Sequence, residues 1–241
     1  EKYFLTWKED EQDDTRFKLD KYLLKMCRKD RLIELMQDFV LFDGVKKLPR
    51  FHQYFATKAA QEHVRQCKGG IIWHTQGSGK SIVMVFLARW ILENKPHARV
   101  AIVTDRDELD KQIERVFTES GEEIYRTSSG NDLARQLGQA KPRLLCSLIH
   151  KFGPRDVDDF ETFIRDLESQ PSQTVGEVFV FIDECHRTQS GKLHRAMKTL
   201  MRNAVFIGFT GTPLLKDDAK TSQEVFGSYI HTYKFSEGVE D

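Results

Sequence analysis

A glycine-rich loop lies between an apolar run and a helical pattern. The stretch "GGIIWHTQGSGKS" (69–81) opens with apolar residues 71–73, which are typical of a buried strand, and a 3.6-residue apolar period follows it. In a strand, glycine loop and helix of this kind, backbone N–H groups and the helix N-terminus face phosphates, the lysine reaches the β and γ groups, and the serine binds Mg²⁺. The stretch therefore predicts a nucleotide site at Thr75, Gln76, Gly77, Ser78, Gly79, Lys80 and Ser81.

Two carboxylates follow a second apolar run. In "VFVFIDECH" (178–186), Asp183 and Glu184 stand at the end of what reads as a buried strand. A lone buried charge is expensive, so the pair needs a cation or a proton to move. We expect Asp183 to hold Mg²⁺ through its waters, and Glu184 to orient and deprotonate an attacking water. A zinc site built from Cys185, His186 and His194 lacks a fourth ligand at suitable spacing, and the carboxylate pair already explains the segment.

A third strand-like run, "VFIGFTGTPL" (205–214), ends in hydroxyl residues. Thr210 and Thr212, on either side of Gly211, can hydrogen-bond both the carboxylate site and a moving neighbour. A simple Gly-Thr-Pro turn is the alternative.

These motifs need a scaffold, and the chain supplies an alternating one. Strand-like runs alternate with helical patterns, which predicts an α/β fold with a parallel sheet covered on both faces. Ligands bind such sheets at the carboxyl ends of the strands, where each motif falls. The expected strands are 71–74, 100–104, 144–147, 178–183 and 205–210, and the expected helices are 81–94, 108–117, 132–137, 157–168 and 192–201.

Residues 1–48 differ from the remainder, 49–241. They are charged and carry leucines at helical spacing, which predicts a helical lead-in that packs on the domain behind it and stops at Asp43-Gly44.

The composition excludes some classes of protein. The 241 residues include 37 basic and 37 acidic side chains, so net charge gives no sign of nucleic-acid binding. No apolar run approaches the ~18 residues of a membrane span. Four widely spaced cysteines fit a reducing cytosol.

The motifs carry a family resemblance. "HTQGSGKS", "DECH" and "GFTGTP" resemble, in order, motifs I, II and III of superfamily 2 helicases and translocases. "PRFHQYFA" (49–56) looks like the upstream glutamine element, in which Gln53 would read the adenine edge. "VTDRDELDKQI" (103–113) is similar to motif Ia of the restriction (R) subunit of type I restriction-modification enzymes, and "FVLFDGVKKLPRFHQYFA" and "LLCSLIHKF" (144–152) also look like that subunit. The resemblance covers residues 39–241.

The resemblance implies the first RecA-like P-loop NTPase lobe of a two-lobed motor, with a mainly parallel central sheet flanked by helices. Such a motor uses ATP and Mg²⁺ to pull double-stranded DNA past itself without separating the strands. It would work in the prokaryotic cytoplasm beside specificity and methyltransferase subunits. The second lobe, which supplies an arginine finger, and the upstream nuclease core are not found in this chain, so we expect poor hydrolysis by the chain alone.

The resemblance also assigns residues. His186, Thr210, Gly211 and Thr212 would couple the ATP site to movement. By the same resemblance, the residues near the DNA backbone would be Thr104, Asp105, Arg106, Ser128, Ser129, Gly130 and Ser147. For "DRDELDKQIER" the alternative is a solvated amphipathic helix with i,i+4 ion pairs.

Three other functions remain open from the sequence. One is another double-stranded DNA translocase, of the type III restriction or remodelling kind. The second is a small-molecule kinase, which would share the phosphate loop but needs no Glu184 to activate water. The third is an ATP-binding scaffold without turnover, which the presence of Lys80, Ser81, Asp183 and Glu184 disfavours.

Overall fold

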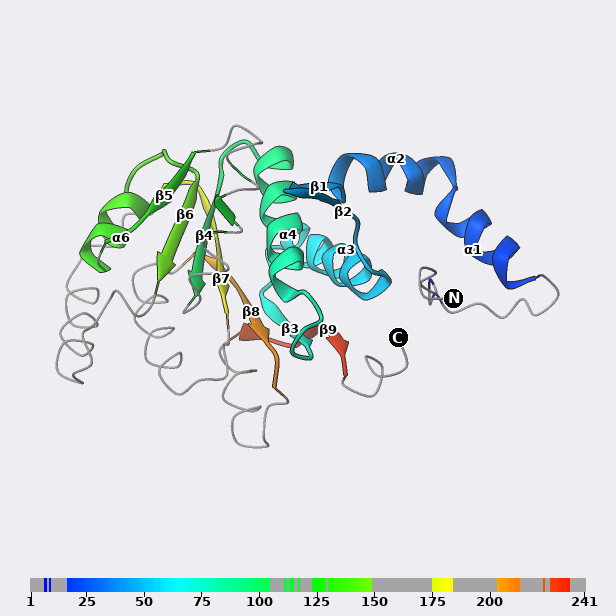
Figure 1. The fold of residues 1–241 in the computed structure, drawn as a ribbon. Helices are drawn as coiled ribbons and strands as arrows, with labels where there is room; N and C mark the ends of the chain where they lie inside the picture. Colours follow the sequence, from blue (N-terminus) through cyan, green and yellow to red (C-terminus); the bar gives the residue numbers. More distant parts are fainter. Residues whose placement is uncertain are drawn as a thin grey trace.

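A parallel sheet forms the centre of the chain (Figure 1). The computed structural model describes residues 7, 9, 17–104, 111, 113, 114, 117, 123–128, 130–148, 175–183, 203–212, 223 and 226–234. Seven strands lie in the order β5-β6-β4-β7-β8-β3-β9, and every neighbouring pair is parallel. All carboxyl ends therefore meet at one edge. The strands are β3 (Gly70–His74), β4 (Ala98–Thr104), β5 (Ile124–Arg126), β6 (Leu144–Leu148), β7 (Glu177–Ile182), β8 (Val205–Thr210) and β9 (Tyr229–Tyr233).

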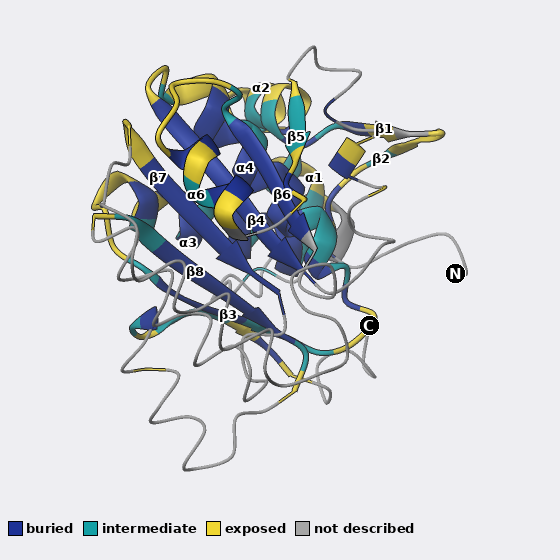
Figure 2. Ribbon diagram, turned by 90° about the vertical axis from the view of Figure 1, so that its left-hand side faces the viewer, coloured by how far each residue is buried: buried dark blue, intermediate teal, exposed yellow. Residues whose placement is uncertain are grey.

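Helices cover both faces of the sheet. Alternate residues along a strand point to opposite faces, and in β4 Ile102 joins the core beneath α3 (Phe51–Arg65) and α4 (Lys80–Asn94). Its neighbour Val103 joins the opposite core, against α6 (Gly130–Leu137). The central strands are buried along almost their whole length (Figure 2), as a sheet covered on both faces requires.

The lead-in consists of two helices and a hairpin. Helices α1 (Lys18–Met26) and α2 (Lys29–Asp38) are followed by β1 (Leu41–Asp43) and β2 (Val45–Lys47), which pair antiparallel. The predicted helix stop at Asp43-Gly44 is therefore wrong. The last helix ends at Asp38, and Gly44 has a positive φ of 70° because it makes the hairpin turn.

All five expected strands are confirmed, with ends that move by one or two residues. Helices α4 and α6 confirm the predictions at 81–94 and 132–137. The expected helices at 157–168 and 192–201 lie outside the described residues, as does most of 108–117. Helix α3 and strands β5 and β9 were not expected. Within the described part of the chain, no helix is long and apolar enough to cross a membrane.

Candidate nucleotide-binding site

The phosphate loop has the backbone that its sequence predicts. It runs from the end of β3 to the start of α4, and Gly77 and Gly79 have positive φ angles of 83° and 80°. There is also no space for a side chain at Gly79, because a Cβ there would collide with Nε2 of Gln53. Both features favour glycine, and they give this loop the strand–loop–helix geometry of a phosphate site.

The lysine of the loop is buried and lies among backbone carbonyls. Lys80 is only 7% exposed, and its Nζ donates to the carbonyl of His74 at 3.1 Å and to that of Thr75 at 3.4 Å. Ser78 closes the turn, because its hydroxyl donates to Thr75 O at 2.7 Å. Ser81 follows Lys80 in the first turn of α4 and is half-buried. The loop thus holds a cation and a hydroxyl at a helix N-terminus, as the sequence predicts.

Helix α3 lies against this loop through two adjacent side chains. Nε2 of Gln53 donates to the carbonyl of Ser78 at 2.8 Å, and Nε2 of His52 contacts the same oxygen at 2.9 Å. Oε1 of Gln53 accepts the backbone N–H of Arg50 at 2.8 Å, which caps the helix. Gln53 is 4% exposed, so its amide orients the loop. The predicted contact of Gln53 with adenine stays a prediction.

Asp183 lies at the same edge of the sheet. It directly follows β7, is 5% exposed, and accepts a hydrogen bond from Oγ1 of Thr104 at 3.1 Å. Its backbone N–H donates to Val103 O at 2.9 Å, which extends the β4–β7 pairing by one residue. Strand β7 is two strands from β3, about 10 Å at ordinary strand spacing. The predicted partners Glu184 and His186 lie outside the described residues, as do Cys185 and His194 of the rejected zinc site.

The hydroxyl residues after β8 make a tight local turn. Thr210 is fully buried and lies opposite Trp73 in the β3–β8 pairing. Its Oγ1 donates to the carbonyl of Thr212 at 3.2 Å and accepts the backbone N–H of Thr212 at 3.3 Å. The segment with Gly211 is therefore a hydrogen-bonded turn beside the loop, and its coupling role stays a prediction.

Several residues expected to contact DNA are occupied within the protein. Thr104 is fully buried on Asp183, and Ser147 shares a 2.6 Å hydrogen bond with Thr127. Ser128 donates its N–H and its hydroxyl to Asp132, at 2.9 and 3.2 Å, just before α6 begins at Gly130. DNA binding by these residues stays a prediction, and Asp105, Arg106 and Ser129 lie outside the described residues.

Four side chains of α3, β3 and β9 pack beside the phosphate loop, and the sequence motifs do not predict them. Nε2 of His74 lies 2.9 Å from Nδ1 of His231 on β9, and the ring of His52 stacks on Tyr233 with centroids 3.9 Å apart. We call His52, His74, His231 and Tyr233 the histidine cluster. Burial lowers the pKa of His74 to about 2, helped by His231, His52 and Lys80, so His74 is neutral at physiological pH. The aromatic and β-branched residues of "YIHTY" are typical of a strand and could have predicted β9.

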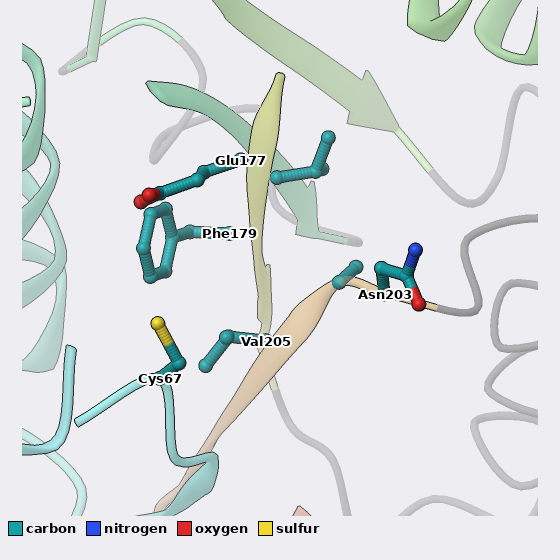
Figure 3. Close-up of a pocket in the computed structure, with 7 residues that line it drawn as sticks. Cys67, Glu177, Phe179, Asn203 and Val205 are labelled. Atoms are coloured by element: carbon teal, nitrogen blue, oxygen red, sulfur yellow. The ribbon is translucent and has the colours of Figure 1, made fainter. Parts of the chain in front are cut away.

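A pocket lies at the opposite edge of the sheet. It has a volume of about 280 Å³, and Figure 3 shows Cys67, Phe179 and Asn203 on its walls. Glu177 and Val205, which also line it, begin β7 and β8. It therefore lies at the amino ends of the strands, away from the phosphate loop.

Curated relatives of this chain include endonuclease subunits of type I restriction enzymes. A putative subunit, MjaIXP of Methanocaldococcus jannaschii, is 31% identical over 89% of this chain and 21% of its own length. The HindI subunit of Haemophilus influenzae is 31% identical over 92% of this chain and 23% of its own length. The chain thus spans between a fifth and a quarter of these relatives.

Solved structures show the same fold at low sequence identity. The UvsW helicase of bacteriophage T4 superposes with a TM-score of 0.54 at 17% identity, over 84% of this chain and 67% of that protein. The SWI2/SNF2 ATPase core of Sulfolobus solfataricus, solved with double-stranded DNA, gives 0.51 at 13% identity, over 76% and 36%. These likenesses confirm the expected α/β fold with a mainly parallel central sheet flanked by helices.

The model of one protein family matches most of the chain. It is described as SWI2/SNF2 ATPase and covers residues 52–241, from His52 beside the phosphate loop through β9. The match contains every described element of the site, while α1 and α2 precede it. Together with the phosphate loop and Asp183, it shows that this chain belongs to the SWI2/SNF2 ATPase family.

Proposed function

We propose that the chain is the ATP-binding first motor lobe of a type I restriction endonuclease subunit, which hydrolyses ATP to pull double-stranded DNA before cleavage. The observation that carries the proposal is the phosphate loop, with left-handed Gly77 and Gly79 and buried Lys80, at the same sheet edge as buried Asp183. Family membership and the type I relatives support it. By the same proposal, 1–48 is a lead-in, 49–241 is the lobe, and a second lobe completes the motor.

The loop fits a nucleoside triphosphate. The left-handed glycines favour a loop in which the backbone N–H groups of Gln76, Gly77 and Gly79 can face an anion at the helix N-terminus. The N–H groups of Thr75 and Ser78 instead donate to Tyr233 O and Thr75 O within the protein. Gln76 and Gly77 are exposed, so the mouth of the loop is open to a ligand. Lys80 stabilises the negative charge that develops on the transferred phosphoryl group.

The oxygen donors of the site fit Mg²⁺. Ser81 supplies a hydroxyl and Asp183 a carboxylate, and this cation prefers such oxygen ligands while keeping several waters. The hydrogen bond from Thr104 holds the Asp183 carboxylate in one orientation. When bound, Mg²⁺ neutralises charge on the phosphates. In this proposal, Glu184 takes the proton of the attacking water. The residues that couple hydrolysis to movement are His186, Thr210, Gly211 and Thr212.

Double-stranded DNA and the specificity and methyltransferase subunits are the proposed partners, in the cytoplasm of a prokaryote. Polar side chains and backbone amides are enough to contact phosphates, so a neutral chain can serve a translocase. Asp105, Arg106, Ser128, Ser129 and Gly130 form the proposed DNA-facing edge, and Thr104 and Ser147, which are buried in this structure, belong to the same proposal.

A remodelling-type double-stranded DNA translocase is the second candidate. The SWI2/SNF2 description of the matching family favours it, and so does the fold shared with the Sulfolobus core. A nuclease core in the same polypeptide would decide for the restriction subunit, whereas a different accessory domain would decide for the alternative.

Equilibrium binding of a fluorescent ATP analogue with Mg²⁺ tests the proposal directly. Lys80→Ala should raise the Kd at least about tenfold, because a charged hydrogen bond worth about 1.5–3 kcal/mol is lost. Lys68→Ala is the matched control, since Lys68 is exposed at the turn after α3. If Lys80→Ala binds as tightly as the unaltered chain, the phosphate-loop assignment is wrong.

The water-activating role is tested in the full-length subunit. Glu184→Gln should abolish ATP turnover stimulated by double-stranded DNA while leaving ATP binding intact, because it removes the proton acceptor. If neither the unaltered subunit nor the Glu184→Gln variant hydrolyses ATP with DNA present, a scaffold that switches shape without hydrolysis is favoured.

A further inference from the structure

We infer that His52 is a positioning residue of the nucleotide site, which fixes the Ser78–Gly79 peptide together with Gln53 and is itself held by Tyr233 of β9. This inference rests on the proposed ATP site. It adds a residue that the motifs do not assign, and it gives β9 a part in nucleotide binding.

The argument starts from the planar peptide. The carbonyl of Ser78 and the N–H of Gly79 belong to one trans peptide, so they point in opposite directions. His52 and Gln53 both bind that carbonyl, at 2.9 and 2.8 Å, on the α3 side of the loop. The N–H of Gly79 is therefore turned away from α3. In a phosphate loop this is the direction in which backbone N–H groups meet the ligand.

The contact also fixes the protonated nitrogen of His52. A carbonyl oxygen only accepts hydrogen bonds, so Nε2 of His52 must carry the hydrogen. His52 is 1% exposed, and Gln53 is the neighbouring donor to the same oxygen. The Ser78 carbonyl thus has two donors for its two lone pairs, and the peptide has no freedom to flip without losing both.

Strand β9 holds the His52 ring in place. Tyr233 stacks on it with an interplanar angle of 11° and is 4% exposed. The same strand is hydrogen-bonded to the start of the loop, because Tyr233 O accepts the N–H of Thr75 at 3.0 Å. His231 holds His74 at 2.9 Å, one residue earlier. The histidine cluster therefore connects both ends of the loop to one strand, and a shift of β9 would move the peptide that faces the phosphates.

His52→Phe separates the hydrogen bond from the packing, because phenylalanine retains a ring against Tyr233 but has no N–H. We expect it to raise the Kd for the fluorescent ATP analogue about tenfold, as the loss of one buried donor on a binding loop implies. His52→Gln restores an N–H near the position of Nε2, and it should bring the Kd back to within about threefold of the unaltered chain.

His63→Phe is the matched control on the same helix. Nδ1 of His63 lies 3.1 Å from a backbone carbonyl, that of Gly69, away from the phosphate loop. Loss of this His63 contact should lower the unfolding midpoint in denaturant and leave the Kd for the ATP analogue unchanged. Tyr233→Leu removes the stacked ring and leaves His52 in place, so it should raise the Kd in the same direction as His52→Phe.

The outcomes separate this inference from the proposed function. If Lys80→Ala weakens binding but His52→Phe does not, the ATP site stands and the inference is overturned. If His52→Phe and His52→Gln raise the Kd equally, packing rather than the hydrogen bond controls binding, and the inference is overturned. If His63→Phe raises the Kd as much as His52→Phe does, overall stability controls binding, with the same consequence. An unchanged Kd in Tyr233→Leu removes β9 from the inference. If Lys80→Ala has no effect, the proposed function fails first.

Discussion

Two glycines of the phosphate loop share a backbone conformation but differ in their surroundings. Gly77 and Gly79 both have φ near 80°, which residues with a Cβ resist. A Cβ on Gly77 would meet no atom within 4 Å, whereas one on Gly79 would collide with Nε2 of Gln53. Gly79 is therefore needed for two reasons and Gly77 for one.

This difference predicts unequal effects of alanine. Gly77→Ala should cost about 1–2 kcal/mol of strain and leave nucleotide binding measurable. Gly79→Ala adds the collision, so Gln53 must move from the Ser78 carbonyl, and the Kd for the nucleotide should rise further than in Gly77→Ala. Titration of the two variants with the fluorescent analogue, alongside their unfolding midpoints, measures the contrast. Similar Kd values for the two would show that Gln53 does not constrain the loop.

The sequence predicts the residues of this site better than their contacts. Glycine, lysine and serine at fixed spacing carry the loop chemistry, so Lys80 and Asp183 could be placed at strand ends in advance. The hydrogen bonds of Gln53 to Ser78 and of Thr104 to Asp183 join residues far apart in the chain. No local pattern encodes such pairs. The role of His52 is not encoded locally either, because its partner Tyr233 lies on β9, far along the chain.

At the scale of elements, two arginines near the amino edge of the sheet close the ends of helices. Arg99 of β4 is 2% exposed, and its Nη1 and Nη2 donate to the carbonyls of Leu137 and Gln136 at 2.8 and 2.7 Å, where α6 ends. Arg143 donates to Leu92 O at 2.6 Å, near the end of α4. The last carbonyls of a helix have no partner within it, so these guanidinium groups satisfy them.

Arg99→Met tests this role. Burial lowers the pKa of Arg99, and its guanidinium group donates to the carbonyls of Leu137, Gln136 and Pro142. Methionine fills much of the space but donates nothing, so the free energy of unfolding should fall by about 3 kcal/mol. Arg28→Met, at an exposed position beside Asp30, should change it by less than about 0.5 kcal/mol. If urea denaturation gives the same change in the free energy of unfolding for Arg99→Met and Arg28→Met, the end of α6 does not need the hydrogen bonds of Arg99.

Elements differ in how well the sequence predicts them, for a physical reason. β7 and β8 are buried on both faces and read as unbroken apolar runs, so their ends were predicted to within a residue. β9 is an edge strand of mixed aromatic, aliphatic and polar residues that is mostly only partly buried, and β5 has only three residues. Helix α3 buries polar side chains that face the loop and the core, among them His52, Gln53 and Gln61, which masks its apolar period.

At the scale of the whole molecule, the lead-in shares the core of the sheet domain. Phe39, just after α2, is fully buried, and its ring lies 4.8 Å from that of Tyr54 and 5.2 Å from that of Phe86. Arg89 of α4 donates to the carbonyls of Val40 and Gln37, both at 3.0 Å. These contacts pack the end of α2 and the residues that follow it against α3 and α4.

Because the Phe39 ring is buried against α3 and α4, we predict that the segment that carries it stabilises the whole sheet domain. Phe39→Ala leaves a cavity between α3 and α4, and it should lower the free energy of unfolding by about 3–5 kcal/mol. Domains of this kind have only about 5–15 kcal/mol in total, so the transition should move far toward lower denaturant. Phe42→Ala is the control, because Phe42 is 55% exposed on β1 and its removal should change the midpoint little. If Phe39→Ala instead leaves the main transition in place and adds a separate early one, the lead-in folds independently of the sheet.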